Sequence, residues 1–141
     1  MMISLILSVL FSLFSEEPVH LSAEYTLSVT VDDISLAEGT LLVDIFDKAD
    51  HFLETPFRST TVKVDTTGSI EVSFEKLPQG TYAVSVIHDH NDNGELDMNA
   101  VGIPTEGYGF SKDAMGMFGP PSFEKAQINI EQSQNIHIHL R

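Results

Sequence analysis

The stretch TYAVSVIHD, residues 81–89, places apolar side chains at alternate positions. A period of two is typical of a β-strand with one buried face, because successive side chains point to opposite sides of the sheet. The same kind of pattern, rich in β-branched and aromatic residues, recurs in six other stretches: 24–31, 39–47, 60–65, 69–74, 125–130 and 135–141. Gly, Pro, Asp or Thr turns separate them. We therefore predict seven strands and, at 47–55, one helical turn.

Seven short strands within residues 24–141 predict an all-β fold. The expected architecture is a seven-stranded antiparallel β-sandwich with Greek-key wiring, of transthyretin-like or immunoglobulin-like type. The last two strands are separated by EQSQ, residues 131–134, a spacing suited to a hairpin.

A turn-and-strand signature adds detail to this fold. In KLPQGTYAV, residues 76–84, Pro78 and Gly80 form a turn, and Tyr82 is placed to tie the following strand back. This short stretch resembles transthyretin-like and collagen-adhesin B-type sandwich modules.

Composition limits the class of protein. The chain has 141 residues, 42% of them hydrophobic and 20% charged, which fits one globular domain. Its 7 Lys and Arg against 21 Asp and Glu give a net charge of −14, which repels nucleic acid and anionic lipid. The absence of cysteine excludes disulfides, thiolate zinc sites and cysteine nucleophiles.

The N-terminus predicts export. Residues 3–14 are apolar and too few to span a bilayer, as in a signal peptide. We predict a signal peptide at residues 1–23, cleaved after Ser15 or Ala23, and a periplasmic or extracellular protein without stable membrane insertion after cleavage. The alternatives are an N-terminal membrane anchor or a buried helix.

More than thirty residues separate the strand that ends near His88 from the one that begins near Phe123. A connection of this length is uncommon in a compact domain and is usually functional. It is rich in glycine and contains the apolar anchors Tyr108, Phe110 and Phe118. We therefore predict a long ordered loop that folds onto the sandwich.

The start of this loop, HDHNDNGELD at residues 88–97, has the composition of a cation site. Asp89, Asn91 and Asn93 followed by glycine match the first half of an EF-hand loop, in which alternate side chains supply oxygens to calcium. The carbonyl of Glu95 and the carboxylate of Asp97 occupy the next ligand positions. Ala100 stands where an EF-hand has glutamate, so this is not an EF-hand.

A distant carboxylate would have to complete the site, and Glu106, Asp113 and Glu124 are the candidates. We predict a calcium site formed by Asp89, Asn91, Asn93, Glu95 and Asp97, with His88 orienting Asp89 through a hydrogen bond. The alternative is a solvated polar turn, since Asn-Gly is itself a strong turn signal.

Histidines raise a transition-metal alternative. His88 and His90 are two residues apart, as are His137 and His139, so each pair shares one face of a strand. The second pair alternates with isoleucine and leucine, which favours histidines that face solvent. We expect this pair to lie outside any zinc or copper site.

No catalytic residues are predicted, because Ser111 and Ser122 lack the context of an activated nucleophile. The expected function is non-catalytic: a calcium-type loop at 89–97 orders a long binding or structural loop. The alternative is a carbohydrate- or peptide-binding module that uses the aromatic loop 102–123 without metal, its partner a cell-surface glycan or protein. Tyr108, Phe110 and Phe118 are the possible contacts.

One resemblance covers much of the chain from His88 onward. The sequence resembles the exported bacterial domain-of-unknown-function family 2141 through HD, NG, LD, GIP, EGYGFS and GPPSF, which lie at residues 88–89, 93–94, 96–97, 102–104, 106–111 and 119–123. The resemblance implies a secreted sandwich and supplies no reaction.

Overall fold

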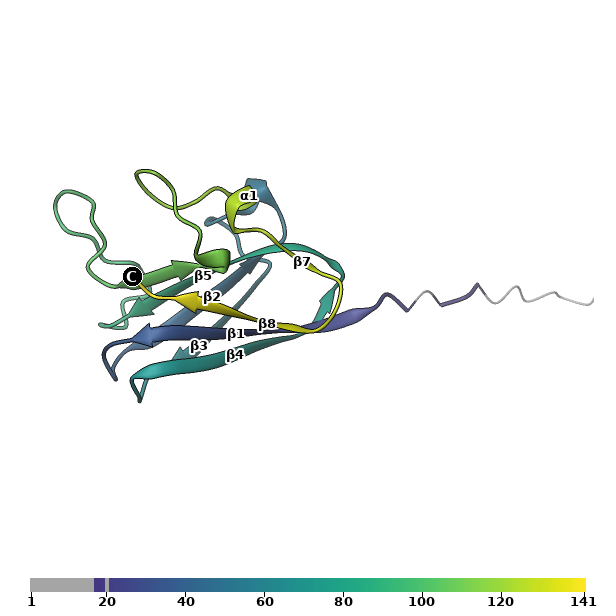
Figure 1. Ribbon diagram of the computed structural model, residues 1–141, viewed down its shortest axis with the longest axis horizontal. Helices are drawn as coiled ribbons and strands as arrows, with labels where there is room; N and C mark the ends of the chain where they lie inside the picture. Colours follow the sequence, from purple (N-terminus) through teal and green to yellow (C-terminus); the bar gives the residue numbers. More distant parts are fainter. Residues whose placement is uncertain (1–16, 20) are drawn as a thin grey trace, which may run out of the picture.

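The computed structural model describes residues 17–19 and 21–141 (Figure 1). The apolar segment 3–14 and the first cleavage position, Ser15, lie outside the described residues. The first strand, β1 (Glu24–Ile34), begins directly after Ala23. Within the described part of the chain, every helix is too short or too polar to cross a membrane.

In the described part of the chain, eight strands form two sheets that are not closed into a barrel, which confirms the predicted all-β fold. The smaller sheet has the order β4-β1-β8, with β4 at Gly68–Pro78 and β8 at Gln134–His139. The larger sheet has the order β3-β2-β5-β6, with β7 also paired to β5. Its strands are β3 (Arg58–Lys63), β2 (Thr40–Phe46), β5 (Gly80–Asp89), β6 (Gly107–Phe110) and β7 (Ile128–Ile130). The short helices are η1 (Ala49–His51), η2 (Ser111–Asp113) and α1 (Phe123–Ala126).

The main core lies between the two sheets. Alternate residues of β1 and β2 are buried, as a strand with one inward face requires. Leu27 and Val29 of the smaller sheet face Leu41 and Val43 of the larger one, and all four side chains are fully buried in the same cluster. The period of two in the sequence therefore identifies the inner face correctly.

Strand pairing differs from the prediction in two respects. β6 was not predicted, because two of its four residues are Gly107 and Gly109, which have low strand propensity. The predicted hairpin of the last two strands is wrong: β7 pairs antiparallel with the start of β5, whereas β8 pairs in parallel with β1. The two strands instead extend different sheets, and the Greek-key wiring is not confirmed.

A second apolar cluster covers the outer face of the larger sheet. It comprises Phe46, Ala83, Phe110, Phe123 and Ala126, with Phe52 packed edge-on against three of the aromatic rings. This cluster lies at the base of α1 and η2, so it anchors the long connection between β5 and β7, as predicted for an ordered loop.

Two loops project from this connection on the same side of the molecule (Figure 1). We call residues 95–106 the first lobe and residues 114–122 the second lobe. The described chain enters β1 from the opposite end of the molecule (Figure 1). The lobes therefore lie far from residues 21–23, which lead into β1.

The predicted tie at Tyr82 is confirmed. Its hydroxyl donates a hydrogen bond to the carbonyl of Pro78 at 2.7 Å, which holds the turn before β5 against the strand. Burial raises the pKa of the Tyr82 hydroxyl, so it remains a donor.

Candidate functional site

The loop that follows β5 is organised around Asp89, whose side chain is 1% exposed. One carboxylate oxygen accepts the backbone N–H of Asn93 at 3.2 Å, and the other accepts that of Gly94 at 2.7 Å. Gly94 has φ of +80°, a left-handed conformation that glycine adopts without strain. Asp89 therefore fixes the turn by holding its backbone.

Three of the predicted ligands meet on the outer side of this turn. The amide groups of Asn91 and Asn93 each donate to one carboxylate oxygen of Asp97, both at 2.7 Å. Their own amide oxygens accept backbone N–H groups, at 3.3 Å for Asn91 and 3.0 Å for Asn93. The side chains predicted to share a cation are thus brought together, and here they bind one another.

Glu106 joins the loop from the far end of the first lobe. Its buried carboxylate accepts the N–H of His90 at 2.9 Å through one oxygen and the N–H of Asp97 at 3.0 Å through the other. Of the three carboxylates that we considered for completing the site, Glu106 alone has hydrogen bonds to it. Asp113 instead bonds to His139, and Glu124 lies exposed on α1.

This donor set fits calcium only in part. Asp89, Asp97 and Glu106 supply carboxylates, but the described residues contain no group of three His, Cys, Asp or Glu side chains that could hold a metal ion. The side chain of Glu95 is exposed, so only its carbonyl is relevant to a cation. Calcium coordination would require Asn91 and Asn93 to turn their amide oxygens toward Asp97, a rotation about one side-chain bond each.

Asp92 faces away from these ligands. Thr40 donates to one of its oxygens at 2.6 Å, and the Lys63 ammonium lies 3.5 Å from the other. The side chain thus ties the turn to β2 and β3.

The predicted role of His88 is wrong. His88 and Asp89 are adjacent in β5 and point to opposite faces of the sheet, so the ring is not placed to orient that carboxylate. Its Nε2–H donates to the carbonyl of Glu38 at 2.7 Å, which leaves Nδ1 to accept from Nε2–H of His90 at 3.1 Å. The two rings line a polar cavity of ≈ 350 Å³ together with Glu106 and Arg141.

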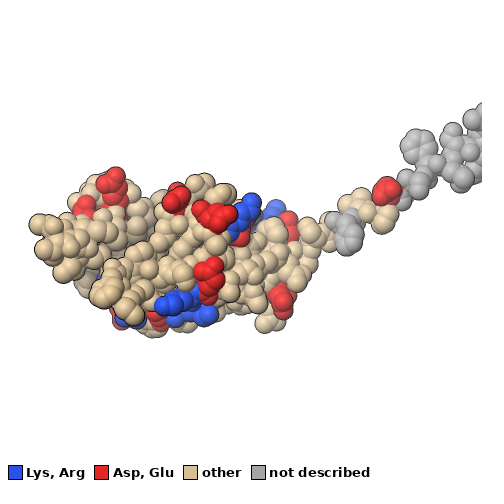
Figure 2. Space-filling model, turned by 90° about the horizontal axis from the view of Figure 1, so that it is seen from above, with Lys and Arg blue, Asp and Glu red and all other residues tan. Residues whose placement is uncertain are grey.

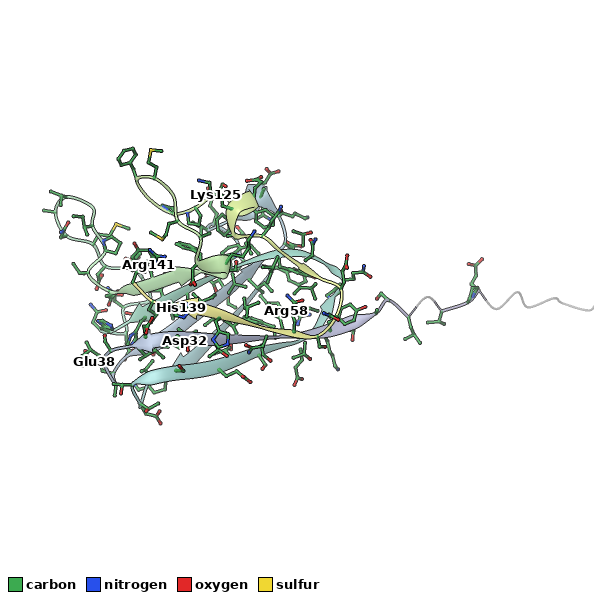
Figure 3. The ribbon with its side chains drawn as sticks, viewed as in Figure 1. Asp32, Glu38, Arg58, Lys125, His139 and Arg141 are labelled. Atoms are coloured by element: carbon green, nitrogen blue, oxygen red, sulfur yellow. The ribbon has the colours of Figure 1, made fainter. Side chains whose placement is uncertain are left out.

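The second histidine pair faces outward, as predicted. The side chains of His137 and His139 are 58% and 50% exposed. Nδ1 of His137 donates to Asp32 of the neighbouring β1 at 2.7 Å, and Asp32 and His139 lie side by side (Figure 3). Hydrogen bonds from Ser69 and then His137 hold the pKa of Asp32 below its usual value.

The two serines have structural partners. The Ser111 hydroxyl is fully buried, donates to the carbonyl of Ala126 at 2.5 Å and accepts the N–H of Val84 at 2.9 Å. Ser122 caps α1 by accepting the N–H of Lys125. The contacts of Ser111 hold η2, the segment directly before the second lobe, against β5 and α1.

A groove of ≈ 730 Å³ lies between the two lobes. Asp44, Ser85 and Tyr108 line it from the strands, and the lobes contribute Met98, Ile103 and Phe118. Of the three predicted contact residues, Phe110 belongs mainly to the outer cluster, Tyr108 is half-buried, and Phe118 is almost completely exposed. The contributions from β2 and Met98 were not predicted, although the methionines of the long loop were visible in the sequence.

These features define a small all-β sandwich with a two-lobed loop region. The chain belongs to DUF2141, a family described as an uncharacterized protein conserved in bacteria, whose family model matches residues 29–138. No curated protein and no solved structure matches the chain. The resemblance to transthyretin-like modules therefore stays a prediction.

Proposed function

We propose that the protein is an exported, non-catalytic binding protein whose ligand lies in the groove between the first and second lobes. The supporting observation is the exposure of apolar side chains that line this one groove. Met117 and Phe118 are 87% and 97% exposed on the second lobe, and Met98 and Ile103 are 56% and 59% exposed on the first. Apolar surface concentrated in this way marks interaction sites, and methionine and aromatic residues are enriched there.

The groove favours a peptide over a glycan. Its lining is mainly apolar, with few polar groups such as Asp44 and Ser85 to bind the hydroxyls of a sugar. Flexible methionine side chains adapt to apolar side chains of different shape. A protein segment is thus the better fit of the two partner classes that the sequence indicates.

A calcium-type cation is a second candidate for the acidic loop. It is supported by the carboxylates of Asp89, Asp97 and Glu106, which all form hydrogen bonds to groups of this loop. Among the described residues, no Lys or Arg forms an ion pair with these three carboxylates. A cation there would stabilise the base of the first lobe and hence one wall of the groove. Outside the cell, sites with dissociation constants of about 10⁻⁴ to 10⁻³ M are sufficient.

The groove is tested with an uncharged apolar dye, Nile red, whose fluorescence rises on binding apolar surface. Phe118→Ser removes a side chain that lines the groove, and Val101→Ser removes one that is 79% exposed on the first lobe but does not line it. Both positions are exposed, so both variants should fold normally. We expect loss of dye binding only in Phe118→Ser; equal binding by the two variants would contradict the proposal.

A further inference from the structure

The charge of the groove indicates the chemistry of its partner. Asp44 lies in β2 with Ser59 and Ser85 directly opposite on the two neighbouring strands, so the nearest cross-strand side chains bring no positive charge. In the described chain, the ion pairs involve other carboxylates, those of Asp32, Asp92 and Asp113. Among residues 17–19 and 21–141, no Lys or Arg lines the groove. Asp44 is therefore a half-buried carboxylate in the wall of a mainly apolar groove, available to a cation from outside.

The wider surface agrees with this local charge. Figure 2 looks down on the lobes, and the left-hand end of the molecule is largely tan with scattered red, whereas most visible blue side chains lie nearer the middle. The net charge of −14 adds a long-range attraction for positively charged partners. It also opposes a second copy of the same chain, because two such molecules repel each other.

We propose that the groove binds an apolar polypeptide segment that carries Lys or Arg, with the apolar side chains between Met98 and Phe118 and one positive charge at Asp44. This inference rests on the proposed binding function and adds the chemistry of the partner. Burial of aliphatic side chains supplies most of the affinity, and the carboxylate selects the sign of the charge. A basic residue that reaches Asp44 in an apolar groove is less screened by solvent than one on an open surface.

The test uses the full chain and three acetylated, amidated nonapeptides, titrated by calorimetry. They alternate leucine with lysine, with glutamine or with glutamate, so that apolar content is constant and only charge changes. We expect the lysine peptide to bind at least tenfold more tightly than the glutamine peptide and the glutamate peptide to bind most weakly. The preference should decrease as salt rises from 50 to 500 mM, values chosen to pass well beyond the screening range of about 0.1 M.

Two matched variants locate the charge. Asp44→Asn and Asp65→Asn change the net charge equally, but Asp65 is exposed and does not line the groove. Asp44→Asn should lower the affinity for the lysine peptide about fivefold and leave the affinity for the glutamine peptide unchanged, in line with a partly buried ion pair. Asp65→Asn should bind all three peptides as the unsubstituted protein does.

The outcomes separate the two proposals. If the glutamine peptide binds as tightly as the lysine peptide and Phe118→Ser weakens both, the binding function stands and the proposed partner chemistry is wrong. If no peptide and no Nile red binds, both are wrong. If sedimentation shows a dimer that Phe118→Ser dissociates, the groove is occupied by a second copy, which contradicts the inference.

Discussion

The carboxylate of Asp113 holds His139 by two hydrogen bonds, one from the backbone N–H at 2.9 Å and one from ring Nδ1 at 2.8 Å. The pair joins η2, at the base of the second lobe, to the last strand, β8. Lys112 and Asp113 both have positive φ, 62° and 50°, which is unfavourable for residues other than glycine. The contacts to His139 offset this local strain and keep the second lobe on the sandwich.

This pair predicts a pH dependence that NMR titration measures directly. The hydrogen bond to Asp113 raises the pKa of His139 above 6.5. Burial alone raises the pKa of Asp113, but the bonds from His139 outweigh it and bring that pKa below 3.8. In Asp113→Asn, we expect the pKa of His139 to fall toward 6.5.

The stabilisation by this pair should be complete only in an intermediate pH range. The contribution of His139 is complete below pH 6.5 and is lost as pH rises through its higher native pKa. That of Asp113 is complete above pH 3.8 and is lost as pH falls through its lower native pKa. In urea denaturation, the loss of unfolding free energy caused by Asp113→Asn should therefore be largest between these two pH values. A deficit equal to that of the exposed control Asp65→Asn at every pH would contradict this interpretation.

Glu106→Gln should destabilise the first lobe. The two oxygens of Glu106 accept two backbone N–H groups, and an amide replaces one of these acceptors with a donor. Leaving a buried N–H without an acceptor costs about 1–3 kcal/mol. Urea denaturation gives the free energy of unfolding. Faster exchange of the backbone N–H of Asp97 or of His90 identifies which of the two hydrogen bonds is lost. The exposed Glu124→Gln is the matched control and should change stability by less than about 0.5 kcal/mol.

Calcium binding is best tested at Asp97, whose carboxylate bonds to the side chains of Asn91 and Asn93. If calcium binds, millimolar calcium should raise the melting temperature and EDTA should reverse the rise. Asp97→Asn should lower the affinity for calcium by at least about tenfold, or 1.4 kcal/mol, because an anionic ligand is lost.

Asp92→Asn is the control for this experiment, since its carboxylate faces Thr40 and Lys63. It should melt earlier yet respond to calcium as the unsubstituted protein does. Equal calcium responses in the two variants would mean that the loop is a polar turn.

Gly39 and Gly68 provide a matched pair for backbone strain. Both have positive φ, +70° and +97°, but a Cβ at Gly39 would lie 2.1 Å from the carbonyl oxygen of Asp89, whereas nothing lies within 4 Å at Gly68. Gly68→Ala should cost about 1–2 kcal/mol for the left-handed conformation alone. Gly39→Ala should cost more than about 3 kcal/mol, because the end of β5 must also move. Equal denaturation midpoints would contradict the close approach.

Local pattern was sufficient to predict most of the described strands, with the exception of β6, but not their partners. The inward residues of β1 and β2 alternate in the sequence, so their burial follows from the period of two. The parallel pairing of β8 with β1 joins residues about a hundred positions apart and has no local signal. The short spacer before β8 is typical of a hairpin. Neither strand has a local sequence feature that indicates the sheet edge with which it pairs.

The candidate site was predictable where one turn forms it and not where distant segments do. Asn91, Asn93 and Asp97 are close in sequence, and they meet in space. The choice of Glu106 over Asp113 and Glu124 depends on how the first lobe folds back. The groove depends further on Asp44 in β2, which only the arrangement of the larger sheet places beneath the two lobes.

The position of β1 between β4 and β8 also determines when the protein can finish folding. A chain emerging stepwise from a ribosome or a translocation channel forms the β1–β4 pair early, since both strands precede residue 79. The other edge of β1 remains open until residues 134–139 arrive. Until then an unpaired strand is exposed to neighbouring chains. A truncated product that lacks the last strand should therefore aggregate, and completion of synthesis is itself a step in the assembly of this sheet.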